Sequence, residues 1–216
     1  MAAHDLASAA HRLSALLLVL VITGCGSRPA TTTAPVTRTF PQIPSRHPDR
    51  VMIALDIDET LAITDYLTLV TGLGNDDSKP YTGAVEIIRE NSEYFDFIYL
   101  TSRPQSLFVE TREWLSNMGF PPGPVLTSAR YVDVFYPLGF KSRMLAAFRE
   151  GSPNLMIGIG DKVTDSQAYA ANRMLPLIVN PAQEAFHEKS IRFDNWEALG
   201  RFLREHRDVL SNPQRL

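Results

Sequence analysis

The sequence predicts an α/β fold: a Rossmann-like three-layer sandwich in which helices cover both faces of a central parallel sheet. Short apolar runs alternate along the chain with amphipathic segments of helical periodicity. Several of these runs are apolar almost throughout, as in strands that are covered on both faces. Ligands bind such sheets beyond the carboxyl ends of the strands, so functional residues are expected there.

The expected elements follow one another in strand-helix alternation. We expect strands at residues 51–57, 96–102, 123–128, 155–161 and 175–180. We expect helices at residues 83–95, 106–119, 141–151, 165–174 and 195–210. Two of these helices end at Gly119 and Gly151, as helices often do. Trp114 and Trp196 stand on apolar helix faces and are expected in the core.

The N-terminal part of the chain is expected to lie outside this fold. Residues 1–24 combine Arg12 with an apolar stretch and small residues, which is typical of a secretory signal peptide. "ITGC", which ends at Cys25, resembles a bacterial lipobox, and that resemblance implies cleavage before Cys25 and its acylation. A plain signal or a short anchor is the alternative. Residues 25–49, rich in Thr, Pro, Ser and Arg, are expected to form a flexible tether, followed by the folded domain at residues 50–210.

The expected location follows from the same segment. A lipidated Cys25 implies a membrane-anchored lipoprotein on the periplasmic face or at the cell surface. Gly26 follows the cysteine where Asp would indicate retention at the inner membrane, so the outer membrane of a Gram-negative bacterium is favoured. No apolar run reaches the roughly 18 residues of a spanning helix. The net charge of -3 shows no basic excess, so nucleic acid is not an expected partner.

Polar residues stand where the expected strands end and helices begin. They are Asp56, Asp58, Thr101, Ser102, Arg103, Lys141, Asp161 and Asp165. Four clustered carboxylates repel one another unless a cation lies among them. Oxygen ligands without His or Cys suit Mg²⁺ better than Zn²⁺. A magnesium site with a lysine and hydroxyl donors is suited to phosphoryl transfer.

Four motifs carry a specific resemblance. "DIDET" (56–60), "IYLTSRP" (98–104), Lys141 and "GIGDKVTD" (158–165) resemble, in order and spacing, the four motifs of the haloacid dehalogenase superfamily. The resemblance covers about residues 51–180 and implies that superfamily's fold. It also implies that Asp56 is a nucleophile that forms an aspartyl-phosphate and that Asp58 is the general acid and base. A second carboxylate at this position is typical of phosphatases and mutases in the superfamily.

The same resemblance implies which residues bind phosphate. Thr101 and Lys141 are expected to hold the phosphoryl group. Ser102 is a further candidate that is otherwise a turn residue. Arg103 is either a phosphate contact or part of a structural salt bridge.

The resemblance also implies the metal ligands. Mg²⁺ is expected on Asp56, on the backbone carbonyl of Asp58, and on one or both of Asp161 and Asp165. Which of the last two is the principal ligand is left open.

A narrower resemblance points to one branch of the superfamily. "YLTSRP", "TREWL", "GPVLTS", "FK", "GDKVTDSQAY" and "LIVNP" are similar in order to the catalytic domain of lipins, which are Mg²⁺-dependent phosphatidate phosphatases. The same domain type occurs in lipid-transfer proteins that lack the nucleophile. Glu59 stands where lipins have Gly, and Asp161 where they have Asn. The insert at residues 62–95 is short, which implies little or no cap domain and an open site.

Three functions are compatible with these residues. The first is a Mg²⁺-dependent phosphatase that acts on phosphatidate-like lipids at a membrane surface. The second is a broad-specificity acid phosphatase for small soluble phosphoesters. The third is a non-catalytic phospholipid-binding module, which would not require both Asp56 and Asp58.

Overall fold

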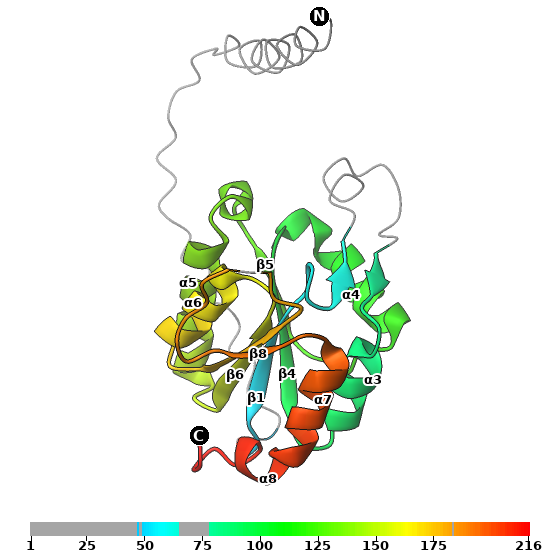
Figure 1. The fold of residues 1–216 in the computed structure, drawn as a ribbon. Helices are drawn as coiled ribbons and strands as arrows, with labels where there is room; N and C mark the ends of the chain where they lie inside the picture. Colours follow the sequence, from blue (N-terminus) through cyan, green and yellow to red (C-terminus); the bar gives the residue numbers. More distant parts are fainter. Residues whose placement is uncertain (1–46, 48, 65–77, 183) are drawn as a thin grey trace, which may run out of the picture. The chain divides into compact units, whose positions relative to one another are not determined.

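Six parallel strands form the central sheet, in the order β5-β4-β1-β6-β7-β8 (Figure 1). The strands are β1 (Met52–Asp56), β4 (Asp96–Pro104), β5 (Val125–Ser128), β6 (Leu155–Gly160), β7 (Leu175–Val179) and β8 (Ile191–Phe193). This computed structural model describes residues 47, 49–64, 78–182 and 184–216. The proposed signal peptide, Cys25 and nearly all of the proposed tether lie outside the described residues. The predicted parallel sheet is confirmed.

Helices cover both faces of the sheet. They are α3 (Ala84–Asn91), α4 (Phe108–Met118), α5 (Pro137–Gly151), α6 (Val163–Ala171), α7 (Trp196–Glu205) and α8 (Arg207–Leu210), with the 3-10 turns η1 (Gln105–Leu107) and η2 (Tyr131–Val134). α5 begins at Pro137, before the expected start, because proline suits the first position of a helix. Lys141 therefore lies in the second turn of this helix rather than at its beginning.

The two sheet faces carry separate parts of the core. Side chains alternate along β1, so Ile53 and Leu55 pack under α3, α4 and α7, whereas Met52 and Ala54 pack under α5 and α6. Figure 1 shows these two helix layers on either side of the sheet. All five residues of β1 are buried, as expected for a central strand. The predicted three-layer architecture is confirmed, and so is the core position of Trp114 and Trp196.

A small antiparallel hairpin follows β1. It pairs β2 (Ala62–Ile63) with β3 (Lys79–Pro80) and leads into α3. The expectation of little or no cap domain also concerns residues 65–77, which lie outside the described residues. Within the described ranges, no helix is both long enough and apolar enough to cross a membrane.

Candidate active site

A tight turn after β1 places the first two carboxylates. β1 ends at Asp56, and the amides of Leu61 and Ala62 both donate to the carbonyl of Ile57, at 2.9 Å. β1 lies between β4 and β6, so its carboxyl end is flanked by the ends of both neighbours. The backbone turns directly after Asp56, so Asp58 lies off the strand.

Glu59 occupies the strained position of this turn. Its φ is 64°, in the left-handed region that favours glycine, which is the residue of lipins at this position. Its carboxylate accepts hydrogen bonds from the amide of Thr64 and the hydroxyl of Tyr81, both at 3.1 Å. Burial, together with the charge of Glu59, raises the pKa of Tyr81 to about 12. Glu59 thus links the turn to the hairpin.

Lys141 is buried between two carboxylates. Its Nζ lies 2.6 Å from Asp56 Oδ1 and 2.5 Å from Asp165 Oδ1. Burial alone would lower the pKa of Lys141, but the charges of Asp165 and Asp56 raise it above its usual value. Burial raises the pKa of Asp56 well above its usual value, although Lys141 opposes this shift. Lys141 is therefore a fixed cation at this site.

Asp165 is completely buried at the start of α6. Its Oδ2 accepts a hydrogen bond from the amide of Lys162 at 3.1 Å, while its Oδ1 faces Lys141. The approach of α6 to β6 requires Gly160, because a Cβ there would lie 2.5 Å from Asp165 Cβ. The glycine of the fourth motif is thus needed for the close packing of α6 against β6.

Asp161 lies on the more open side of the cluster and is half-buried. Thr60 Oγ1 lies 3.1 Å from Asp56 Oδ2 and 3.0 Å from Asp161 Oδ1, so one hydroxyl lies between both carboxylates. Burial and the charge of Asp165 raise the pKa of Asp161 to about 6. Trp196 Nε1 donates to the carbonyl of Thr60 at 3.0 Å and supports the turn from α7. Sequence reasoning gave Thr60 no role, although it ends the first motif.

Asp58 is held by a different set of donors. Its Oδ1 accepts from Arg103 Nε at 2.9 Å and from Thr64 Oγ1 at 2.9 Å, and its Oδ2 accepts from Thr101 Oγ1 at 2.8 Å. Burial would raise the pKa of Asp58, but the charge and hydrogen bonds of Arg103 outweigh it and lower the pKa. Arg103 thus forms the salt bridge that the sequence had left as one alternative. Thr64 carried no signal in the sequence.

The remaining candidate for phosphate binding is Ser102. It lies on β4 between Thr101 and Arg103 and is half-buried. Among the described contacts, no hydrogen bond joins its hydroxyl to the carboxylates. The structure therefore brings the other candidates together at the carboxyl ends of the strands and leaves Ser102 beside them.

The acidic cluster fits a divalent metal ion. Asp56, Asp161 and Asp165 each offer a carboxylate oxygen, and these oxygens lie within 4.8 Å of one another. When all three carboxylates are ionised, they and Lys141 carry a net charge of two negative units, while Arg103 balances Asp58. A dication would neutralise the cluster, and a set of oxygen ligands is the kind that Mg²⁺ prefers.

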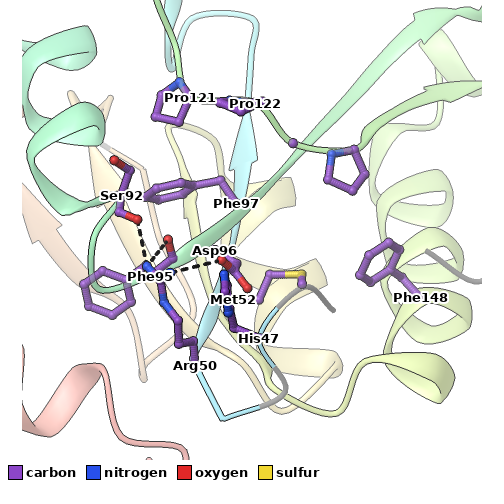
Figure 2. Close-up of a pocket in the computed structure, with 12 residues that line it drawn as sticks. His47, Arg50, Met52, Ser92, Phe95, Asp96, Phe97, Pro121, Pro122 and Phe148 are labelled. Carbon is purple, nitrogen blue, oxygen red and sulfur yellow. Dashed lines mark hydrogen bonds and ion pairs between the residues drawn. The ribbon is translucent and has the colours of Figure 1, made fainter. Parts of the chain in front are cut away.

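A separate cavity of about 510 Å³ lies at the opposite end of the sheet (Figure 2). It is lined by residues at the starts of β1 and β4, among them Arg50 and Asp96. Arg50 Nη2 donates to the carbonyls of Ser92 and Phe95, at 2.7 and 3.2 Å. None of the predicted site residues lines this cavity, so it is not part of the carboxylate site.

Solved structures with a similar fold include several phosphatases. D,D-heptose 1,7-bisphosphate phosphatase from B. bronchiseptica, complexed with magnesium and phosphate, is 15% identical, with a TM-score of 0.55 over 72% of this chain and 99% of its own. A predicted phosphatase from Clostridium acetobutylicum is 14% identical, with a TM-score of 0.52 over 72% and 99%. A Had-superfamily hydrolase from Ehrlichia chaffeensis is 14% identical, with a TM-score of 0.51 over 73% and 97%. These matches confirm the haloacid dehalogenase fold.

The family is given by the sequence itself. No curated protein sequence matches the chain. The model of the LNS2 domain of PITM 1-3 matches residues 53–177, which is more than half of the chain and includes all four motifs. The resemblance to the lipin-type branch is thereby confirmed, and the chain belongs to the LNS2 domain family.

Proposed function

We propose that the chain is a Mg²⁺-dependent phosphomonoester hydrolase that works through an aspartyl-phosphate on Asp56. One observation carries the proposal: a nucleophile candidate and a second carboxylate, Asp58, lie beside a buried lysine and two further carboxylates at one strand edge. A site that only binds phosphate needs donors and cations, not a paired nucleophile and proton carrier. The phosphatase-type fold and the family membership support the same conclusion.

The cluster has the ligands to hold the metal ion. The carboxylates of Asp56, Asp161 and Asp165 would bind Mg²⁺, with the backbone carbonyl of Asp58 as a proposed fourth ligand. When bound, Mg²⁺ offsets the negative charge that develops on the phosphoryl oxygens. Lys141 supplies a second, permanent positive charge beside the nucleophile. We propose that Lys141 and Thr101 hold the phosphoryl group in line with Asp56.

The reaction proceeds in two displacements. In the first, a carboxylate oxygen of Asp56 attacks phosphorus, the ester bond to the leaving alcohol breaks, and Asp58 gives that oxygen its proton. In the second, Asp58 takes a proton from water as the water oxygen attacks phosphorus, and inorganic phosphate leaves Asp56. Asp58 thus ends the cycle protonated, ready for the next substrate.

Arg103 sets the charge of Asp58 between these steps. It holds Asp58 as a carboxylate, which is the form that accepts a proton from water. The first displacement requires the protonated form. A phosphoryl dianion that enters the site repels the Asp58 carboxylate and competes for Arg103, and both effects raise the pKa of Asp58.

We propose phosphatidate-like lipids as the substrate class and a membrane surface as the place of reaction. Membership of the LNS2 family and the lipin-like motif order support a lipid phosphate. The proposed acylation of Cys25 would hold the domain at the membrane, on the periplasmic or outer face of the cell. Small soluble phosphoesters are the second candidate, because one of the solved structures of similar fold is a D,D-heptose 1,7-bisphosphate phosphatase.

A phospholipid-binding module is the third candidate, and one observation favours it. The family model that matches is that of the LNS2 domain of PITM 1-3. By the resemblance to lipins, this domain type also occurs in lipid-transfer proteins that lack the nucleophile. The presence of Asp56 speaks against this reading, because the inactive relatives lack the nucleophile.

One assay separates the three candidates. The full chain is incubated with phosphatidate in mixed micelles and with a soluble aryl phosphate, with and without Mg²⁺, beside Asp56→Asn. We expect Mg²⁺-dependent release of phosphate from phosphatidate and none from the variant. Activity without Mg²⁺ or in Asp56→Asn overturns the mechanism. Turnover of the aryl phosphate alone indicates the second function, and phosphatidate binding without turnover indicates the third.

A further inference from the structure

An exposed apolar segment stands beside the candidate active site. Its members, here called the apolar tip, are Val132, Val134, Phe135, Tyr136 and Leu138. Phe135 is 80% exposed and Tyr136 66% exposed, which is unusual for adjacent aromatic side chains. Contiguous exposed apolar groups of this kind mark an interaction surface.

Buried neighbours anchor the tip to the domain. Asp133 is buried beneath it and accepts hydrogen bonds from Ser128 Oγ and Arg143 Nη2, both at 2.8 Å. On the other side Phe140, a residue of α5, is buried in the core. The exposed aromatic residues therefore project from an anchored turn, and their exposure is not caused by a loose chain.

The tip shares its end of the sheet with the active site. It follows the carboxyl end of β5, and α5, which begins within it, carries Lys141. Figure 1 shows the yellow-green segment between β5 and α5 at the end of the sheet to which the strand arrows point. Ile63 on β2 and Val109 in the first turn of α4 are also exposed, and both follow the carboxyl ends of site-bearing strands. Exposed apolar groups thus follow the carboxyl ends of three strands, β1, β4 and β5.

We propose that the apolar tip inserts into the interface of a lipid bilayer that carries anionic head groups. The shape and chemistry fit this occupant: a convex turn with adjacent Phe and Tyr is suited to the boundary between acyl chains and water. Arg130 and Arg143 flank the tip and are exposed, while Asp133 is the buried acid between them. The net positive charge of these three groups complements an anionic surface.

Insertion would turn the open edge of the sheet toward the bilayer. A phosphate on a membrane lipid would then meet Asp56 and Lys141 without leaving the bilayer. The inference rests on the proposed function only in naming lipid as the substrate, since insertion itself needs no catalysis.

Tryptophan fluorescence tests insertion directly. Full chains with Phe135→Trp or Val209→Trp are mixed with vesicles of phosphatidylcholine and phosphatidylserine that contain brominated acyl chains. Val209 is a matched control because it is 43% exposed and lies on α8, at the opposite end of the sheet (Figure 1). The native Trp114 and Trp196 are buried in both proteins and give a common background.

We expect bromine to quench the emission of Phe135→Trp and not that of Val209→Trp. Equal quenching of both, or of neither, overturns the proposal. A blue shift of Phe135→Trp that grows with protein concentration in the absence of vesicles would identify a second copy of the chain as the occupant, and would also overturn it.

Turnover distinguishes this inference from the proposed function. In a Cys25→Ser background, which removes the proposed lipid attachment, Phe135→Ser should reduce hydrolysis of phosphatidate in vesicles by about tenfold, the effect of one lost aromatic burial. Hydrolysis of a soluble aryl phosphate should not change. An equal loss on both substrates contradicts the role of the tip. If neither substrate is hydrolysed, the proposed function fails, while the quenching result still decides insertion.

Discussion

The guanidinium of Arg103 forms a buried ion pair with the carboxylate of Asp58. Its Nη2 and Nε lie 2.8 and 2.9 Å from Asp58 Oδ1, and Arg103 is only 3% exposed. Two charges at such depth interact strongly, and neither can be removed without leaving the other uncompensated. The protonation of Asp58, and with it the proton transfers of the proposed reaction, is therefore controlled by Arg103.

Replacement of Arg103 tests this control. Arg103 lowers the pKa of Asp58, so Arg103→Gln should raise it. The first displacement needs protonated Asp58, and the variant should keep that proton to higher pH. The alkaline limb of the profile of kcat/KM against pH should therefore move to higher pH, even though phosphate binding and the maximal rate fall. An unchanged limb would contradict the pairing.

Stability provides a second measure of the same pair. The pKa of Asp58 is lower in the folded chain than in the unfolded chain. The ion pair therefore stabilises the fold at pH values above the pKa of Asp58 in the unfolded chain, and this stabilisation is lost as the pH falls through its pKa in the folded chain. Arg103→Gln should weaken the dependence of the free energy of unfolding on pH in this acidic range. The control is Arg112→Gln, on the exposed face of α4, which should change neither profile.

Lys141 should be essential to stability when Mg²⁺ is absent. Lys141→Met leaves Asp56 and Asp165 buried without their shared cation, and removal of one partner from a buried ion pair costs roughly 3–5 kcal/mol. Urea unfolding without Mg²⁺ should show this loss. Added Mg²⁺ should restore part of it, because the dication replaces the missing charge.

The control for Lys141→Met is Lys189→Met, at an exposed position, which should unfold like the unaltered chain. A Lys141→Met protein as stable as the unaltered one, with or without Mg²⁺, would show that the three charges do not depend on one another.

Much of the fold could be predicted because central parallel strands leave a plain record in the sequence. β1 and β6 are almost wholly apolar, and both were located to within a residue or two. β8 was missed because it is a three-residue edge strand with Arg192 in its middle, so it has no apolar run. The β2–β3 hairpin was missed because two-residue strands are too short for any periodicity.

The site was predictable in its residues and not in its pairings. The motifs placed Asp56, Asp58, Lys141 and the acidic pair at one edge because parallel strands end together. Which carboxylate Lys141 or Arg103 would face depends on side-chain geometry, and the spacing of residues in the sequence does not specify that geometry. Arg103 thus remained ambiguous in the sequence, and Thr64, which follows a turn of unknown shape, could not be connected to Asp58 at all.

Gly160 should control the metal site through packing. Gly160→Ala introduces a Cβ that would lie 2.5 Å from Asp165 Cβ and 2.6 Å from its Cγ, so α6 must move away from β6. Asp165 would then lose its place beside Lys141, and we expect Mg²⁺ affinity to fall by about 10- to 100-fold, as when partners that orient metal ligands are lost. Isothermal titration with Mg²⁺ measures the change.

Gly139→Ala is the matched control for this substitution. Gly139 lies in α5, where an added Cβ meets only the end of Arg143, at 3.4 Å. Its Mg²⁺ affinity should stay unchanged. Equal affinities for the two variants would show that the contact between β6 and Asp165 does not shape the site.

Glu59 combines a strained backbone with two hydrogen bonds, and two substitutions separate these effects. Glu59→Gly and Glu59→Ala both remove the bonds from Thr64 and Tyr81, but only glycine relieves the φ of 64°. The Gly variant should therefore be more stable than the Ala variant by about 1 kcal/mol in urea unfolding. If Ala proved equal to Gly, the turn would have to relax on mutation, and Glu59 would not be the strained residue.

Arg173, with a φ of 56°, tests the same comparison away from the site. Arg173→Gly should exceed Arg173→Ala in stability by a similar amount, because the backbone strain is alike. Phosphatase activity should distinguish the two positions. Only the Glu59 variants remove the side-chain hydrogen bonds from Thr64 and Tyr81 to the turn that carries Asp58, so only they should lower kcat. A loss of kcat in the Arg173 variants as well would indicate that activity follows global stability, and the link from Glu59 to Asp58 would then have no separate role.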